Sequence, residues 1–265
     1  MKLLFQDEIN NFVENLTIET CPRSIALVGK RGSGRKTTAS NIAEKLNIQK
    51  KDITKKLNFD DIIEIYVNSV PMLYIIDGDS LSEKDQYSLL KFLEEPPKLC
   101  IACVICEDGK LLETIMNRCY QIHFVPYTNE QLSHFYNGSN PYILELFETP
   151  GEILNYKDID LEPYQSLVNN MVKNLNRANI SNVLTIPNKF NFDKKLTNND
   201  RLDFLPFVGI LRNTIYKNCL KNSDVYPLYS EILSMCKKLE MNNLSKKNIF
   251  ENFLIDAKMK NLLWE

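Results

Sequence analysis

The fold is decided by one stretch near the N-terminus, Ser24-Ile25-Ala26-Leu27-Val28-Gly29-Lys30-Arg31-Gly32-Ser33-Gly34-Arg35-Lys36-Thr37-Thr38. It opens with a short apolar run that predicts a buried strand of a parallel sheet. A glycine-rich, basic turn follows, and helical spacing then predicts a helix from about Lys36 to Leu46. Glycines let backbone N–H groups turn inward, and the N-terminus of the following helix favours negative charge. The stretch therefore predicts a loop shaped to bind phosphate.

The loop departs from the nucleotide-binding consensus Gly-x4-Gly-Lys-Ser/Thr at its chemical positions. Counted from Gly29, the second glycine falls correctly at Gly34, but the lysine position is Arg35 and the hydroxyl position is Lys36. Lys36 and Thr37 would satisfy the consensus only in a loop one residue longer. A guanidinium is a planar fork, and a lysine cannot ligate Mg²⁺. We therefore expect a loop that keeps its shape after losing part of its chemistry.

A second phosphate-site signal is the apolar run Met72-Leu73-Tyr74-Ile75-Ile76, which ends at Asp77. P-loop enzymes place an acidic residue at the end of such a strand to hold the water shell of Mg²⁺. The next position, where a carboxylate would orient the attacking water, is Gly78, and Asp79 follows one residue later. Hydrolysis is therefore not expected. The candidate phosphate-site residues are Gly29, Gly32, Gly34, Arg35, Lys36, Thr37 and Asp77.

Composition excludes several classes of protein. The chain has 265 residues, of which 44% are apolar, and its 32 basic and 34 acidic side chains give a net charge of −2. The length suggests two or three domains. No apolar run approaches the roughly 18 residues that a membrane span needs, and the first residues lack a signal-peptide core. The near-neutral charge argues against nucleic-acid binding by bulk charge, so any such contact needs a local patch.

The cysteines indicate a reduced, cytoplasmic protein, because their number is odd and they form no disulfide framework. The group Cys100-x2-Cys103-x2-Cys106 is separated by apolar residues, whereas zinc ligands would favour turn residues and a fourth ligand nearby. In a strand, Cys100 and Cys106 would share one face and Cys103 the other. We expect a buried strand and no zinc.

Strands and helices alternate in the first half of the chain. Strand–helix alternation is typical of a parallel sheet with helices on both faces, so the fold class is α/β followed by all-α parts. The run 48–58 is polar and Lys-rich, and no element is assigned to it. After Pro126 we expect short helices over 128–160, with turns at Asn137-Gly138 and Pro150-Gly151, and mainly helix from 163, with 186–200 as a loop. The expected strands are 24–28, 71–77, 99–106 and 120–125, and the expected helices are 6–17, 36–46, 59–68, 82–95 and 110–117.

One string is specific to a family: Leu89-Leu90-Lys91-Phe92-Leu93-Glu94-Glu95-Pro96-Pro97, directly after the Ile-Ile-Asp strand. With Lys110–Cys119 and His123–Pro126, it resembles clamp-loader AAA+ proteins, especially the delta-prime and, less closely, the tau/gamma subunits of bacterial DNA polymerase III. The resemblance implies three parts. These are an AAA+ P-loop domain over 1–126, a helical lid over 127–162 and a helical collar, used for oligomerisation, over 163–265.

The resemblance also implies roles for single residues. Arg118 matches the arginine that reaches across a subunit interface toward a neighbour's ATP, and a guanidinium there can stabilise the transferring phosphoryl group. The family's two sensor positions fall at Ile105 or Cys106 and at Glu152. Five nucleotide-handling positions differ from the family's pattern, whereas the arginine at position 118 is kept. This combination resembles delta-prime, a subunit that does not hydrolyse ATP but helps its neighbour to do so. The departing positions are Arg35, Lys36, Gly78, Cys106 and Glu152.

The partners implied by the resemblance are other clamp-loader subunits in a hetero-oligomer, a sliding clamp and primer-template DNA, without a membrane. Only about 40 residues separate the loop from Asp77, which leaves no room for the family's four-cysteine zinc module. Binding of ATP or ADP stays open. One alternative is an active, helicase-loader-like AAA+ ATPase that uses Lys36 and Thr37 in a shifted loop. Another is a nucleic-acid adaptor that binds through Lys30, Arg31, Arg35 and Lys36.

Overall fold

The computed structural model describes residues 2–53, 70–94, 96–138, 140–174, 177–192, 201–239, 245–262 and 264. The helix predicted over 59–68 lies outside these ranges. The chain divides into two compact units, Met1–Asn137 with Glu148–Lys157, and Gly138–Phe147 with Asp158–Glu265. Each unit is described by itself below.

The first unit is built on a five-stranded sheet in which every neighbouring pair is parallel. The strand order is β2-β3-β4-β1-β5, so β1 lies inside the sheet between β4 and β5. Parallel neighbours require crossover connections, which place helices on the sheet faces. The strands are β1 (Ser24–Val28), β2 (Gln49–Ile53), β3 (Met72–Asp77), β4 (Cys100–Cys106) and β5 (Tyr120–His123).

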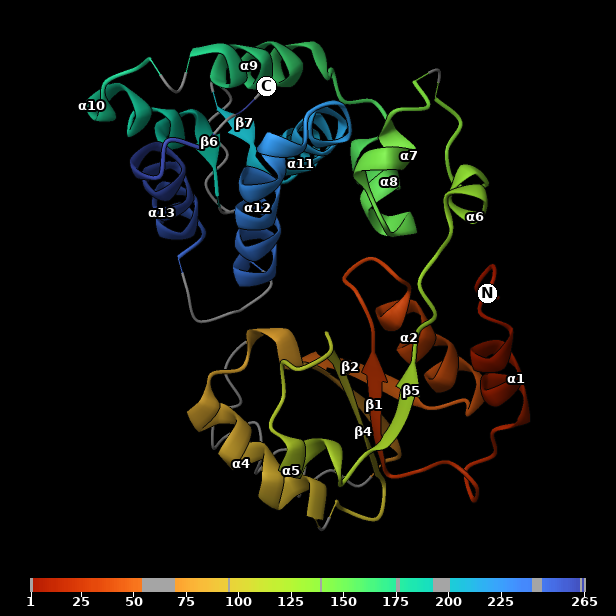
Figure 1. Cartoon of the computed structure of the whole chain (residues 1–265). Coiled ribbons are helices and arrows are strands. Elements are labelled where there is room, and N and C mark those ends of the chain that lie inside the picture. Colours follow the sequence, from red (N-terminus) through yellow and green to blue (C-terminus); the bar gives the residue numbers. More distant parts are fainter. Residues whose placement is uncertain are drawn as a thin grey trace. The chain divides into compact units, whose positions relative to one another are not determined.

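Helices cover both faces of this sheet (Figure 1). On one face, α1 (Asp7–Asn15) and α2 (Arg35–Lys45) contribute to a core cluster that contains Ile42. On the other, α4 (Glu83–Glu94) and α5 (Glu113–Met116) contribute to a cluster that contains Phe92. Because both faces are covered, β1 is buried along its whole length, as its apolar sequence predicts. The predicted α/β class is confirmed.

The three cysteines of β4 are buried packing residues. Cys100 and Cys106 belong to the cluster on the α4 face and Cys103 to the cluster on the α2 face, which confirms the predicted alternation. Burial raises the pKa of Cys100 and of Cys106 to about 12, so both stay protonated thiols at neutral pH. Among the residues described, no three His, Cys, Asp or Glu side chains come together as a metal site. The absence of zinc stays a prediction.

One strand was not predicted, and one predicted turn was wrong. The polar run 48–58 contains strand β2, of which only Ile53 is buried. Strand β2 lies at the edge of the sheet, where lysines are tolerated, and its pairing with β3 overrides its weak intrinsic preference. Pro150-Gly151 is not a turn but the start of helix α8 (Pro150–Tyr156). Proline suits the first position of a helix, because its missing N–H would have no partner there.

The second unit is mainly helical, as expected. Its longest helix, α11, packs against α9 and α12, and α12 packs against α13 (Figure 1). The predicted loop over 186–200 begins with a 3₁₀ turn, η2 (Ile186–Lys189), and its residues 193–200 lie outside the described ranges. The other elements of this unit are α7 (Ile143–Leu146), α9 (Glu162–Asn174), α10 (Ile180–Val183), β6 (Phe190–Asn191), β7 (Leu202–Asp203), α11 (Phe204–Lys221), η3 (Ser223–Val225), α12 (Tyr226–Leu239) and α13 (Lys246–Met259).

The core of the second unit is formed by apolar stripes on its helices. On α11 the buried residues include Leu211 and Ile215, and on α12 they include Ile232 and Met235. Leu205, at the start of α11, is 45% exposed. A group of aromatic rings joins helices that are distant in sequence, since the ring of Phe190 contacts those of residues 192, 204, 207 and 250. These stripes are therefore the unit's own core.

Segment 127–162, expected as a separate lid, is shared between the two units. Helices α6 (Asn129–Ser133) and α8 belong to the unit with the sheet, and α7 belongs to the helical unit. The three-part division at 126 and 162 stays a prediction. None of the helices in the described part of the chain is long and apolar enough to cross a lipid bilayer.

Candidate functional site

The predicted phosphate loop connects β1 to α2 and has the backbone shape that its glycines require. Gly32 and Gly34 have φ angles of +89° and +107°, in the left-handed region where residues with a Cβ are strained. Gly34 is also the N-cap of α2. A Cβ on Gly29 would lie 2.7 Å from Cβ of Phe124, so close packing requires glycine there. The three glycines hold the loop in place for reasons of geometry and packing.

Arg35, at the lysine position of the consensus, is bound within the unit. Its side chain is 6% exposed, and its Nη2 lies 3.0 Å from Oδ2 of Asp79. The other carboxylate oxygen of Asp79 accepts a hydrogen bond of 2.6 Å from the backbone N–H of Glu107. Two buried atoms, Nη1 of Arg35 and Oγ of Ser33, have no hydrogen-bond partner among the described residues. Asp79 thus ties the start of α2 to the end of β4.

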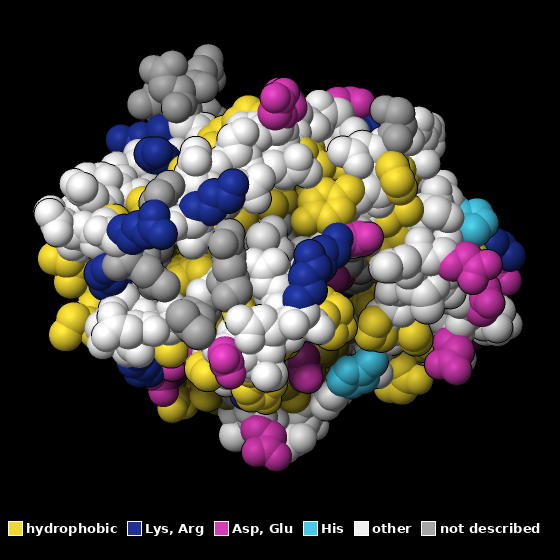
Figure 2. Space-filling view, turned by 45° about the horizontal axis from the view of Figure 1, so that its top comes forward, with side chains coloured by type: hydrophobic (Ala, Val, Ile, Leu, Met, Phe, Trp, Pro, Cys, Tyr) yellow, Lys and Arg dark blue, Asp and Glu magenta, His cyan; other side chains and the backbone are white. Residues whose placement is uncertain are grey.

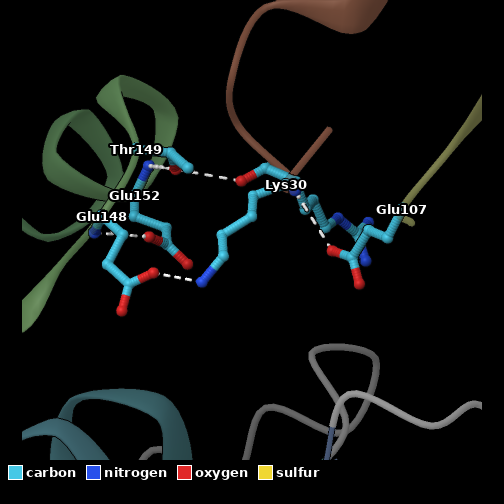
Figure 3. A network of polar contacts seen from close by, with 6 residues as sticks. Lys30, Glu107, Glu148, Thr149 and Glu152 are labelled. Carbon is cyan, nitrogen blue, oxygen red and sulfur yellow. Dashed lines mark hydrogen bonds and ion pairs between the residues drawn. The ribbon is translucent and has the colours of Figure 1, made fainter. Parts of the chain in front are cut away.

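Other carboxylates of the chain meet further donors of the loop, two of which are drawn in Figure 3. The backbone N–H of Arg31 donates to Oε1 of Glu107 at 3.1 Å, and Lys30 forms an ion pair with Glu148. Lys36 turns toward the edge strand β2, where its Nζ lies 2.6 Å from Oδ2 of Asp52. Carboxylates from four segments of the chain therefore supply negative charge to the loop.

The first turn of α8 packs directly on the loop (Figure 3). The hydroxyl of Thr149 donates a hydrogen bond to the carbonyl oxygen of Arg31 at 2.9 Å. The N–H of Gly151 donates to the carbonyl oxygen of Gly32 at 3.0 Å. A Cβ on Gly151 would lie 2.7 Å from Cα of Gly32, so the two backbones touch. This contact, together with the Lys30–Glu148 ion pair, is called the loop–α8 clasp below.

The end of β3 offers one half-buried carboxylate, and the position after it is closely packed. Burial, helped by the neighbouring charge of Asp79, raises the pKa of Asp77, while Arg31 and Arg35 lower it. A Cβ on Gly78 would lie 3.0 Å from Cγ1 of Val104 and 3.1 Å from the carbonyl oxygen of Ile105. A side chain at position 78 would therefore require these neighbours to move by a few tenths of an ångström.

The two sensor positions serve local structure. Cys106 is buried in the sheet, and its carbonyl oxygen accepts from the N–H of Gly29 at 3.0 Å. The side chain of Glu152 turns back toward the start of α8, where its Oε2 accepts a hydrogen bond of 3.1 Å from the backbone N–H of Glu148. Burial raises the pKa of Glu152. Neither residue brings a positive charge toward the loop.

This donor set differs at three positions from what a Mg²⁺-nucleotide needs. Such a ligand needs free inward N–H groups, an ammonium group near the phosphates and a hydroxyl on Mg²⁺. Here Lys36 is paired with Asp52, Thr37 is half-buried in the first turn of α2, and the carboxylate of Glu107 accepts the N–H of Arg31. The negative charge of Glu107 beside the loop would repel phosphate.

Arg118 lies apart from the loop, in the turn after α5. Its Nη1 donates to the carbonyl oxygen of Thr114 at 2.8 Å, and its Nη2 forms an ion pair with Glu94, the last residue of α4. The side chain of Arg118 is 35% exposed, so part of the guanidinium faces solvent. All the polar contacts of this guanidinium within the described ranges come from the α4 and α5 segments.

Sequence reasoning missed the carboxylates of Asp52, Glu107 and Glu148 and the hydroxyl of Thr149. One signal could have indicated Glu107, because it directly follows β4 at the carboxyl edge of the sheet, where ligand sites of parallel sheets lie. No sequence signal pairs residue 148 with residue 30, since 118 residues separate them.

Comparisons with known proteins give one match by sequence and several by structure. No curated protein matches the chain. Among solved structures, a gamma subunit-related protein of DNA polymerase III from Thermotoga maritima is 14% identical, with a TM-score of 0.45, and the match covers 96% of this chain and 99% of that one. The RuvB Holliday junction branch migration motor of the same organism is 17% identical, with a TM-score of 0.47, over 95% and 87% of the two chains.

By sequence, residues 60–128 match the model of the family described as DNA polymerase III, delta subunit. The matched range contains β3, β4, the string Leu89–Pro97 and Arg118. It covers a part of the chain and excludes the loop at 29–37. Residues 60–128 are thus a region like that of the DNA polymerase III delta-subunit family.

Proposed function

We propose that this chain is a delta-prime-like clamp-loader subunit, which does not hydrolyse ATP itself and supplies Arg118 to the ATP site of a neighbouring subunit. The observation that carries the proposal is a contrast between two sites. Four donors of the loop, on Lys30, Arg31, Arg35 and Lys36, are bound by carboxylates of the chain, whereas Arg118 is partly exposed on a segment that resembles the delta subunit.

The lack of hydrolysis rests on three positions. Lys36 is paired with Asp52, Gly78 has no side chain and is closely packed, and Glu152 is bound at the start of α8. A P-loop ATPase needs a cation on the phosphates and a group that orients the attacking water. Nothing in this arrangement supplies either, so the chain on its own is expected to have no turnover.

The role of Arg118 rests on its placement. An arginine that acts on a neighbour's ATP must reach the surface, and it must be held in one geometry to stabilise the transferring phosphoryl group. The carbonyl of Thr114 and the carboxylate of Glu94 hold this guanidinium by two of its nitrogens. A guanidinium has further N–H donors, which leaves some of them for a phosphate oxygen.

The proposed partners are other clamp-loader subunits, a sliding clamp and primer-template DNA, in a cytoplasmic hetero-oligomer. Exposed apolar side chains on α11 and α12 provide a surface for subunit contacts: Leu220 is 69% exposed, Tyr226 63% and Leu233 44%.

Co-purification of tagged chain from its native source, followed by ATPase assays of the recovered assembly, tests the proposal. Arg118→Ala should reduce turnover by at least about tenfold, because an arginine finger contributes on the order of 10³ or more to kcat at one site. Arg118→Lys should rescue it poorly, since an ammonium cannot reproduce the planar fork. Arg177→Ala, at an exposed arginine of the helical unit, is the control and should change nothing.

Two outcomes would contradict the proposal. If Arg118→Ala leaves the assembly's turnover unchanged, the residue has no finger role. If the isolated chain hydrolyses ATP and Lys36→Ala abolishes the turnover, the helicase-loader-like ATPase with a shifted loop is correct instead.

A further inference from the structure

Charge is distributed unequally between the two units. The unit with the sheet has 17 Lys and Arg against 21 Asp and Glu, whereas the helical unit has 15 against 13. Their net charges are therefore −4 and +2, although the whole chain carries −2. The helical unit is therefore basic although the whole chain is close to neutral. Where the positive charge of this unit lies decides what the unit can bind.

Much of that charge gathers at one end of the helical unit, which we call the lysine end. It consists of Lys189 in η2, Lys237 and Lys238 in the last turn of α12, and Lys246 and Lys247 in the first turn of α13. All five residues are exposed.

Contacts within the unit place these lysines together. Helices α12 and α13 pack against each other, and α13 also packs against η2. Figure 1 shows the C-terminus of α12 and the N-terminus of α13 at the same end of the pair. Nζ of Lys247 donates to Oδ1 of Asn188 at 3.2 Å, which brings Lys189 to the same place. At the left of Figure 2, the side where Figure 1 shows α10 and α13, several Lys and Arg side chains lie near one another.

Four of the five lysines have no acidic partner among the described residues. The segments 177–192, 232–239 and 245–250 contain no Asp or Glu, and the acidic residues that flank them in sequence are Asp193, Glu231, Glu240 and Glu251. Lys247 has an ion pair with Glu251 at 3.7 Å, whereas the other four lysines make no ion pair with any residue that the structure describes. Lys246 and Lys247 also lie at the positive end of a helix dipole, where further positive charge is unfavourable. A bound polyanion would relieve this repulsion.

We propose that the lysine end binds the phosphate backbone of a nucleic acid without regard to its sequence. Lysine ammonium groups act on phosphates as point charges, and phosphate contacts position a nucleic acid without reading its bases. Protein–protein interfaces instead favour aromatic residues and arginine and are depleted in lysine. All five members of the lysine end are lysines, so a polyphosphate suits this surface better than an acidic protein. The proposal does not depend on the role of Arg118 or on clamp loading.

Binding of a fluorescent single-stranded DNA to the purified full chain, measured by anisotropy at several salt concentrations, tests the proposal. Five phosphate contacts predict a slope of log affinity against log salt of about −3.5. The double variant Lys238→Glu/Lys246→Glu should weaken binding by about tenfold or more at low salt and reduce the slope by about 1.4. The control, Lys173→Glu/Lys221→Glu, changes the net charge equally at exposed lysines of α9 and α11, outside the lysine end, and should weaken binding no more than about twofold.

Three results would overturn the proposal. The first is that the unchanged chain does not bind the DNA at low salt. The second is equal weakening by both double variants, which would assign binding to net charge alone. The third is that poly-glutamate of matched charge displaces the DNA as well as unlabelled DNA does, which would assign the surface to an acidic protein. Circular dichroism melting of both variants verifies that each is folded.

Discussion

At Gly78 the backbone passes so close to β4 that a single Cβ would contact Val104 and the carbonyl of Ile105. The residue lies directly after Asp77, in the 3₁₀ turn that ends β3. A P-loop ATPase needs a water-orienting carboxylate in this region, and the close approach of β4 leaves little room for one. A side chain introduced here would require its neighbours in β4 to move by a few tenths of an ångström.

Glu152 lends itself to a prediction about pH. Burial raises its pKa above the ordinary value of 4.5, so between 4.5 and the raised value the folded chain binds more protons than the unfolded chain. Stability therefore falls as pH rises through this window, and the loss persists above it. Glu152→Gln removes the charge and keeps an oxygen for the N–H of Glu148. We expect the free energy of unfolding at pH 7 to rise by about 0.5 kcal/mol.

Urea unfolding from pH 4 to pH 8 measures this effect. The gain from Glu152→Gln should grow as pH rises through the window and be independent of pH below 4.5, where both side chains are neutral. Glu130→Gln, at an exposed carboxylate in the first turn of α6, is the matched control and should show no such growth. A gain that shrinks with rising pH would show that the hydrogen bond to Glu148 outweighs burial.

At the scale of elements, the loop–α8 clasp connects two segments more than a hundred residues apart. The hydroxyl of Thr149 and the N–H of Gly151 hold two carbonyls of the loop, and the Lys30–Glu148 ion pair lies beside them. Because α8 contacts the loop by its own backbone, the connection needs no phosphate between them. The clasp agrees with the proposed lack of hydrolysis, since α8 and the loop hold each other directly.

Gly151→Ala tests the clasp. Alanine normally stabilises a helix relative to glycine by about 0.5 to 1 kcal/mol, but here its Cβ would lie 2.7 Å from Cα of Gly32. We expect the opposite sign, a loss of about 1 to 3 kcal/mol in the free energy of unfolding, because backbone atoms must move apart. Asn155→Ala, at an exposed position of the same helix, should be neutral or stabilising in the same urea titration. Stabilisation by Gly151→Ala would show that α8 does not rest on the loop.

Sequence predicted the elements whose own residues determine them. The strand Ser24–Val28 and the cysteine strand were predicted from apolar runs, and the loop from its glycines. Strand β2 was missed, because its residues are polar and only pairing with β3 makes it a strand. The loop's carboxylate partners were missed for a related reason. Glu107 and Glu148 reach the loop through tertiary structure, and no local pattern encodes which carboxylate meets which donor.

At the scale of the whole molecule, the two units differ in what they offer to partners. The unit with the sheet is acidic, its loop is bound internally, and it presents Arg118. The helical unit is basic and carries both the lysine end and exposed apolar side chains on α11 and α12. This division agrees with the proposed function, in which the unit with the sheet acts at the ATP site of a neighbouring subunit and the helical unit contacts other subunits.

If the apolar side chains of α11 and α12 make those contacts, charges there should release the chain from its assembly. Leu220→Glu/Leu233→Glu places two carboxylates on exposed positions, so the isolated chain should keep its stability within about 0.5 kcal/mol. Its recovery with partners from the native source should fall by about tenfold or more, because burying two unpaired charges in an interface costs several kcal/mol. Leu154→Glu, at a leucine of α8 that is 54% exposed, is the control and should leave recovery unchanged. Equal recovery of all three chains, measured by quantitative mass spectrometry, would show that this surface lies outside the subunit interface.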